Sequence, residues 1–156
     1  MLFIVDAMLG NVAKKLRLLG FDAEYLSDVD DSVLIEKSKN ENRVIITKDN
    51  ELTEKAKKNG LSVVYIAQEN EIEQFLEILK QTNLKLNGIS GDVARCTKCN
   101  SLTYAIEKSK ISQNVSQGVL ENNDRFWKCK NCDQIYWEGT HIKNLQKFVK
   151  KLKTFG

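Results

Sequence analysis

The sequence predicts an α/β protein: a parallel sheet flanked by helices, followed by a small metal-binding module and a basic C-terminal helix. Two observations support this fold class. In the first half, short apolar runs alternate with helical patterns, which is typical of βαβ units and a parallel sheet. In the second half, two Cys-x-x-Cys pairs appear and the alternation stops.

Residues 2–6 (LFIVD) form the first expected strand, because four apolar residues in a row suit a strand covered on both faces. Gly20 supplies a left-handed cap to the helix that follows. Asp31 is expected to be the N-cap of the next helix. After the first strand, the predicted elements are helix 11–19, strand 23–26, a helix from 31, strand 43–47, helix 50–58, strand 61–66 and helix 71–82.

Carboxylates follow the first and third expected strands, at Asp6 and Asp49. If the strands are ordered 2-1-3-4, the first and third are neighbours and a crevice opens above their ends. Asp6 and Asp49 would face each other there, with the acidic loop 28–31 nearby. Clustered carboxylates repel unless a cation joins them, and Mg²⁺ and Mn²⁺ prefer oxygen ligands. The pattern thus predicts a divalent-cation site suited to phosphodiester hydrolysis.

The four cysteines form two Cys-x-x-Cys pairs separated by 29 residues, which predicts a structural Cys₄ zinc site in a ribbon. The long gap implies a loop around residues 113–124. Asn100 and Asp133 each follow a pair, and both residue types tolerate the positive φ of a metal knuckle. Two disulfides or a redox dithiol are the alternatives, and the lack of a secretion signal disfavours disulfides. The expected zinc ligands are Cys96, Cys99, Cys129 and Cys132.

Charge is unevenly distributed along the chain. Residues 1–90 contain 12 Lys/Arg and 15 Asp/Glu, whereas residues 91–156 contain 12 and 6. A basic half beside an acidic half is a common electrostatic footprint for nucleic acid, although basic surfaces also serve solubility. The longest apolar run is far shorter than the ~18 residues of a membrane span, so we expect a cytoplasmic protein with no membrane association.

The chain is expected to end in an amphipathic helix whose polar side is rich in lysine. Such lysines are usually a solvated face, but they are also candidates for contacts with RNA phosphates. His141, the single histidine, lies at the start of this helix, where a structural role is more common than a catalytic one. The candidate RNA-binding lysines are Lys143, Lys147, Lys150 and Lys151.

These segments suggest four units: a core at 1–84, a linker at 85–93, the ribbon at 94–140 and the helix at 141–156. No glycine-rich nucleotide cradle follows any predicted strand, and no G-x-S-x-G nucleophile elbow is present. Nucleotide-cradle and serine-hydrolase chemistry are therefore excluded, and the acids and cysteines remain as the chemistry-bearing groups.

Several motifs together resemble the PIN-like ribonuclease domain family. More closely, the chain resembles its branch with a C-terminal zinc ribbon, the Mut-seven C-terminal RNase domain. The motifs cover nearly the whole chain, although Asp133 stands where a glycine often follows the second cysteine pair. They are IVDAMLG at 4–10, LRLLGFD at 16–22, Asp30-Asp31, ITKD at 46–49, FWKCKNC at 126–132 and YWEGTH at 136–141.

The resemblance implies a ribonuclease that uses Mg²⁺ or Mn²⁺, with Asp6, Asp31 and Asp49 as metal-binding catalytic acids and the adjacent Asp30 as a further candidate metal ligand. RNA is the implied partner; the resemblance leaves open the natural substrate and the oligomeric state. Two alternatives are a non-catalytic RNA-binding or adaptor module on the same fold and a zinc-ribbon scaffold for protein interactions. Neither explains the retained carboxylates, which would repel RNA phosphates.

Overall fold

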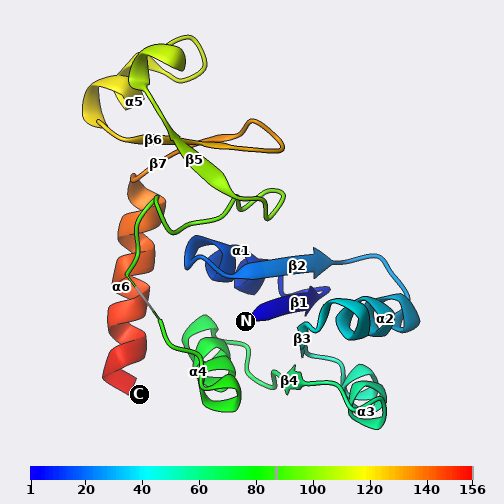
Figure 1. Ribbon diagram of the computed structural model, residues 1–156. Helices are drawn as coiled ribbons and strands as arrows, with labels where there is room; N and C mark the ends of the chain where they lie inside the picture. The colour runs from blue at the N-terminus through cyan, green and yellow to red at the C-terminus, as the bar shows by residue number, and fades with distance from the viewer. Residues whose placement is uncertain (87, 156) are drawn as a thin grey trace.

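The computed structural model describes residues 1–86 and 88–155 and contains two sheets, one above the other in Figure 1. Helices surround the lower sheet, and the long last helix runs from the upper sheet down to the lower one. In chain order the elements are β1 Leu2–Asp6, α1 Gly10–Leu18, β2 Asp22–Leu26, α2 Asp31–Glu41, β3 Val44–Thr47, α3 Asn50–Lys58, β4 Val63–Tyr65, α4 Glu71–Thr82, β5 Thr103–Ile106, the 3₁₀ turn η1 Lys108–Lys110, α5 Gln117–Asn122, β6 Phe126–Cys129, β7 Ile135–Trp137 and α6 Thr140–Phe155.

The lower sheet has four strands in the order β2-β1-β3-β4, and all its neighbouring pairs are parallel. This is the 2-1-3-4 order that would make the first and third strands neighbours, and it confirms the predicted α/β fold class. Val5 pairs with Ile46, so the carboxyl ends of β1 and β3 lie side by side. The chain leaves these two strands toward opposite edges of the sheet, which makes this the topological switch point.

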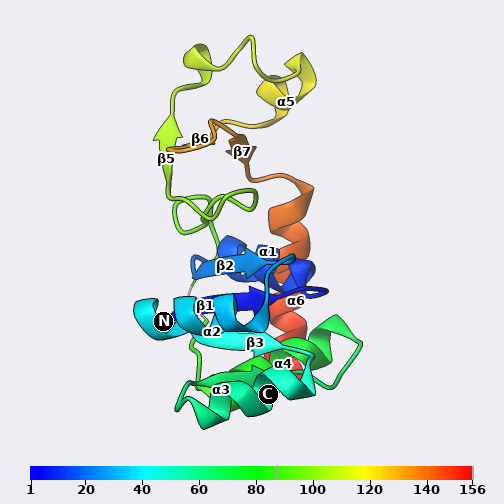
Figure 2. The same cartoon turned by 90° about the vertical axis from the view of Figure 1, so that its right-hand side faces the viewer.

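Helices cover both faces of the parallel sheet (Figure 2). On one face, α1, α4 and α6 pack over Phe3 and Val5. On the other face, α2 and α3 pack over Ile4 and Ile45. The alternating direction of side chains along β1 explains this division, because successive residues point to opposite faces. Both faces of β1 are thus buried, as its uniformly apolar sequence predicts.

Helix α6 returns from the upper sheet and completes the lower core. Leu145, Val149 and Leu152 are buried in the same cluster as α1 and α4. Phe148 meets Phe75 of α4 edge-to-face, with ring centroids 5.2 Å apart. Helix α6, which is sixteen residues long, therefore contributes its apolar face to the hydrophobic core of the parallel sheet, although it lies far from the strands in sequence.

The upper sheet is antiparallel with the order β5-β6-β7. Its strands β6 and β7 flank the second cysteine pair, and β5 follows the first pair. The expected loop at 113–124 contains the short helix α5. Within residues 1–86 and 88–155, no helix has the combination of length and apolar character needed to cross a bilayer.

Candidate functional site

Asp6 is the last residue of β1, and its half-buried side chain lies beside the end of β3. The Thr47 hydroxyl donates a hydrogen bond to Asp6 Oδ2 at 2.8 Å. The same hydroxyl accepts the backbone N–H of Asp49 at 2.9 Å. Thr47 is fully buried, so this bridge is shielded from water. One hydroxyl thereby fixes Asp6 and Asp49 on either side of it at the switch point.

Asp49 is the N-cap of α3. Its Oδ1 accepts the backbone N–H groups of Glu51 and Leu52, at 2.8 and 3.3 Å. The helix N-terminus favours a negative charge at this position. Within the described residues, Asp49 Oδ2 accepts no hydrogen bond, so it remains available to a ligand.

The prediction that Asp31 caps α2 is wrong. Asp30 is the N-cap: its backbone is extended, and its carbonyl accepts the N–H groups of Val33 and Leu34. Asp31 is the first residue of the helix, because Asp30 is the last residue with non-helical dihedrals. The Asp31 carboxylate therefore does not cap the helix, and it pairs with Lys55 Nζ of α3 at 3.4 Å.

The expected carboxylates are neighbours rather than a closed ligand shell. Across residues 1–86 and 88–155, no three carboxylates gather closely enough to hold an ion together. Asp6 and Asp49 are joined through Thr47, whereas Asp31 connects to α3 only through Lys55. Asp30 is exposed beside Asp31. Asp6 and Asp49 thus lie together at the strand ends, whereas Asp30 and Asp31 lie at the start of α2, where Lys55 offsets part of their charge.

Met8 lies two residues after Asp6 and has a left-handed backbone with φ 72°. Its side chain is 84% exposed, the highest exposure among the large apolar residues. A non-glycine residue in this region costs roughly 1–2 kcal/mol, so the turn between β1 and α1 stores some strain. Strained residues concentrate at functional sites. No local sequence signal indicates this conformation, since Met is not a usual left-handed residue.

The four cysteines converge in the ribbon, with all four Sγ atoms within 4.8 Å of one another. All are free thiols, so the disulfide alternative is not supported. The knuckle residues Asn100 and Asp133 have φ of 68° and 62°, as expected from their residue types. The N–H groups of Asn131 and Cys132 donate to Cys129 Sγ. Four sulfurs in this arrangement could hold zinc.

The thiols differ in acidity. Burial raises the pKa of Cys129. At Cys99 burial also opposes ionisation, but hydrogen bonds involving Ser101 outweigh it and lower the pKa to about 5. Zn²⁺ binds the thiolate form of cysteine and displaces the thiol protons, so the hydrogen bonds that favour the Cys99 thiolate also favour a cation here.

The first cysteine knuckle docks on β2, the edge strand of the parallel sheet. Asn100 Nδ2 donates to Asp22 Oδ1 at 2.7 Å, and Asn100 Oδ1 accepts the Ala23 N–H at 3.0 Å. Arg17 of α1 donates to the carbonyls of Ala23 and Thr97, at 2.8 and 2.7 Å. These bonds satisfy backbone groups that an edge strand would otherwise expose. They also fix the cysteine cluster to the core.

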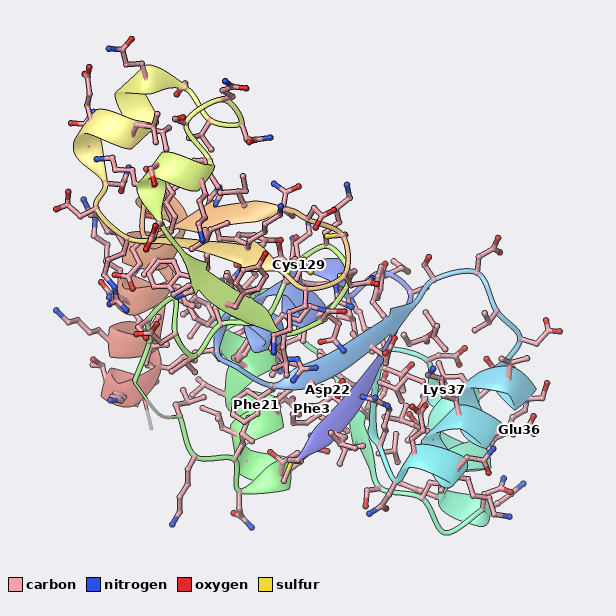
Figure 3. The ribbon with its side chains drawn as sticks, turned by 45° about the horizontal axis from the view of Figure 1, so that its top comes forward. Phe3, Phe21, Asp22, Glu36, Lys37 and Cys129 are labelled. Carbon is pink, nitrogen blue, oxygen red and sulfur yellow. The ribbon has the colours of Figure 1, made fainter. Side chains whose placement is uncertain are left out.

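Asp22 also pairs with Arg43, whose Nη1 lies 2.8 Å from Asp22 Oδ1. Figure 3 shows Asp22 next to Phe3 and Phe21, below the ribbon strand that carries Cys129. Partial burial raises the pKa of Asp22, but hydrogen bonds from Arg43 and Asn100 outweigh it and hold the pKa below its ordinary value. The carboxylate is therefore a charged junction between sheet and ribbon.

The family model described as the Mut7-C RNAse domain matches residues 1–149. The chain belongs to the Mut7-C RNAse domain family. Comparisons with curated proteins and with solved structures gave no match. Family membership indicates a ribonuclease-type function with RNA as substrate class.

In this Mut7-C RNAse domain, the candidate RNA-binding lysines lie on α6. All four are exposed on the helix whose apolar face is buried against α1 and α4, and His141 is exposed in its first turn. The lysines are thus held in fixed positions along the core. They are Lys143, Lys147, Lys150 and Lys151.

Two site residues escaped sequence reasoning. Thr47 looked like the polar end of a strand, and its bridging role depends on the register of β1 against β3. Asn100 was noticed only for its backbone conformation, whereas its amide also binds the sheet edge. For Thr47, the available sequence signal was a threonine directly before a Lys-Asp pair. No local sequence signal marked the contact of Asn100 with the sheet edge.

Proposed function

We propose that this Mut7-C RNAse domain is a Mg²⁺- or Mn²⁺-dependent ribonuclease that hydrolyses RNA phosphodiester bonds at the ends of β1 and β3. One observation carries the proposal: Thr47 bridges Asp6 and Asp49 at the topological switch point of the sheet. In open α/β folds this is where ligands bind. Family membership supports the reaction class.

The chemistry of the donor set fits a hard divalent cation. Asp6 and Asp49 each use one oxygen in hydrogen bonds within the protein, which leaves the other oxygen of each as a ligand. Asp31 would complete the set after releasing Lys55, with Asp30 as the adjacent acid. When bound, such a cation supplies an activated water and offsets the charge that develops on the phosphate.

The chain's own residues do the positioning. Thr47 holds the Asp6 carboxylate in one orientation from a fully buried position. The first turn of α3 holds Asp49 through two backbone N–H donors. Lys55 neutralises Asp31 when no cation is present, which reduces the repulsion among the acids. This arrangement orients the carboxylates before substrate arrives.

Binding of RNA is assigned to the basic half of the chain. The acidic half has a net charge of −3 and residues 91–156 a net charge of +6, so the acid site by itself would repel phosphate. We propose that the ribbon, organised by structural Zn²⁺ on Cys96, Cys99, Cys129 and Cys132, aids RNA binding together with the α6 lysines.

The test is cleavage of a labelled single-stranded RNA by the zinc-loaded protein, with and without added Mn²⁺. We expect cleavage only with Mn²⁺ and a loss of at least 100-fold in Asp6→Asn, the order expected when charge stabilisation at the reacting phosphate is removed. Asp28→Asn, in the exposed loop before α2, is the matched control and should keep wild-type activity. RNA binding without cleavage by the wild type would favour the non-catalytic module instead.

A further inference from the structure

A cavity of about 420 Å³ lies where the ribbon meets α1 and the first turn of α6. Its size falls in the ~300–1,000 Å³ range of small-molecule sites. The cavity runs along β7, an outer strand of the upper sheet, and the four consecutive residues from Gln134 to Trp137 line it. The acid site at the strand ends does not include any of these residues. The cavity is therefore a separate feature of the molecule.

Aromatic side chains form much of the wall. Both tryptophans of the chain, Trp127 and Trp137, line the cavity together with Tyr136. Trp127 is held firmly: its indole N–H donates to Asp92 at 3.0 Å. Trp137 is half-buried, and among the described residues its indole N–H has no hydrogen-bond acceptor. A flat, partly exposed ring with an unused donor is suited to stacking on a planar ligand that carries acceptors.

The wall is also tied to the cysteine cluster. The Tyr136 hydroxyl lies 3.0 Å from Cys96 Sγ and 3.3 Å from Thr97 Oγ1. Tyr136 and Trp127 are directly opposite each other on β7 and β6. The aromatic surface thus keeps its shape only while the cysteines hold the ribbon together.

Cationic and titratable groups surround this aromatic wall. Lys14 enters from α1, Arg95 from the segment before the first knuckle and His141 from the first turn of α6. Lys14 and His141 are exposed, so their side chains can reach a ligand's charged group. The lining contains no Asp or Glu. Aromatic rings flanked by cations are the features that bind single-stranded nucleic acid, through base stacking and phosphate contacts.

Helix α1 connects the cavity to the acid site. The helix begins at Gly10, four residues after Asp6, and Lys14 and Leu18 on its cavity side are one turn apart. At 1.5 Å per residue, the helix spans about 12 Å from Gly10 to Leu18. A short stretch of single strand can bridge such a separation.

We propose that this cavity is a base-binding subsite for single-stranded RNA. A base stacks on Trp137, and the exposed Lys14 and His141 contact the neighbouring phosphates, whereas Arg95 is paired with Asp22 and lines the wall. This inference rests on the proposed ribonuclease function and extends it: the enzyme grips its substrate at a fixed distance from the acid site. It favours unpaired RNA, because a base inside a duplex cannot enter the cavity.

Binding is measured in the Asp6→Asn variant, so that cleavage does not consume the probe and a failure of catalysis leaves the test intact. The probe is a short labelled oligoadenylate, and two signals are followed: its anisotropy and the protein's tryptophan fluorescence. Because both tryptophans line the cavity, we expect RNA binding to quench the fluorescence with the same midpoint as the anisotropy change. Binding with unchanged tryptophan fluorescence would contradict the proposal.

Variants locate the contact. Added to the Asp6→Asn background, Trp137→Ala should weaken oligoadenylate binding by about 5- to 150-fold, the usual effect of losing one base–aromatic stack, and Trp137→Phe should restore most of it. Lys14→Gln should flatten the slope of log affinity against log salt by about 0.7, whereas the control Lys57→Gln on α3 should not. Zinc content verifies that the ribbon is intact. If Trp137→Ala loses zinc, the comparison of Lys14→Gln with Lys57→Gln and the tryptophan fluorescence still test the proposal.

Other occupants would produce different results. AMP, which offers one base and one phosphate, should bind at least tenfold more weakly than the oligonucleotide. Equal affinity would indicate a mononucleotide site and overturn the single-strand proposal. Fluorescence that depends on protein concentration in the absence of RNA would show that a second copy of the chain covers the cavity, which would also overturn it.

Discussion

Thr47 is the side chain on which the geometry of the acid site depends most. Its hydroxyl is fully buried and makes one bond to a carboxylate and one to a backbone N–H. A hydrogen bond to a charged group contributes about 1.5–3 kcal/mol, more than a neutral one. Thr47 does not need to touch substrate to matter, because it orients Asp6, a proposed metal ligand.

Replacement of Thr47 by Val keeps the shape of the side chain and removes both hydrogen bonds. We expect Thr47→Val to raise the apparent dissociation constant for Mn²⁺ about tenfold and to lower cleavage in proportion. Thr47→Ser, which retains the hydroxyl, should restore both values. A Thr47→Val protein that binds Mn²⁺ like the wild type would show that the bridge has no positioning role.

Strand β2 is the element that joins the two halves of the molecule, and the charged junction at its start is its most specific feature. Asp22 accepts from Arg43 and Asn100, and Arg43 is 7% exposed. When an arginine is buried to this degree, removal of its partner carboxylate destabilises the folded protein. The junction therefore stabilises both the sheet edge and the docked knuckle.

We expect Asp22→Asn to reduce the free energy of unfolding by about 2 kcal/mol, less than for a fully buried pair because Asp22 is partly exposed. The folded-state pKa of Asp22 lies below its ordinary value, so its contribution is complete above about pH 4 and is lost only as the pH falls through the lowered pKa. The difference between wild type and variant should thus be constant from pH 6 to 8. A difference that changes across this range would implicate another titrating group.

Helix α6 presents its lysines at fixed positions because its apolar face is buried. If Lys147, Lys150 and Lys151 each contact one phosphate, changing all three to Gln should reduce the slope of log affinity against log salt by about 2 for single-stranded RNA. The loss should be similar for all sequences, and the Mn²⁺ dependence of cleavage should not change. The control with equal charge change is Lys39, Lys57 and Lys58→Gln on α2 and α3. If both triple variants lose the same slope, net charge alone explains the effect.

The elements themselves were largely predictable from the sequence. Helices α3 and α4 begin and end at the expected residues, because their caps and apolar spacing are local signals. The right-handed crossover rule restricted the possible strand orders, and the order found is the 2-1-3-4 arrangement considered among them. Long-range contacts were not predictable: the docking of Asn100 on β2 and the packing of α6 into the core each join residues more than seventy positions apart. The cap of α2 was misplaced by one residue because Asp30 and Asp31 carry the same side chain.

The two halves of the molecule are coupled through the cysteine cluster. The chain passes from the sheet into the ribbon and returns to the sheet as α6, and the knuckle binds the sheet edge on the way. A metal bound by the cysteines would therefore affect more than the ribbon. Structural zinc sites contribute folding free energy, and here that energy would extend to β2.

Removal of zinc by a chelator should increase hydrogen exchange in the ribbon and at the amide of Ala23, whose N–H is bonded to Asn100 Oδ1. Val5, paired within the sheet centre, should stay protected and serves as the internal reference. Asn100→Gly keeps a residue suited to the positive φ and should expose Ala23 even with zinc bound. Protection at Ala23 that survives chelation would show that knuckle and sheet are not coupled.

The carboxylates at the ends of β1 and β3 are proposed to bind a divalent cation. The decisive measurement uses crystals of the zinc-loaded protein soaked in Mn²⁺, with diffraction data collected just above the manganese absorption edge. We predict an anomalous peak in contact with both Asp6 and Asp49, and its absence from crystals of the Asp6→Asn, Asp49→Asn double variant soaked in the same way. A wild-type crystal with Mn²⁺ only at other positions, or with none, would contradict the claim.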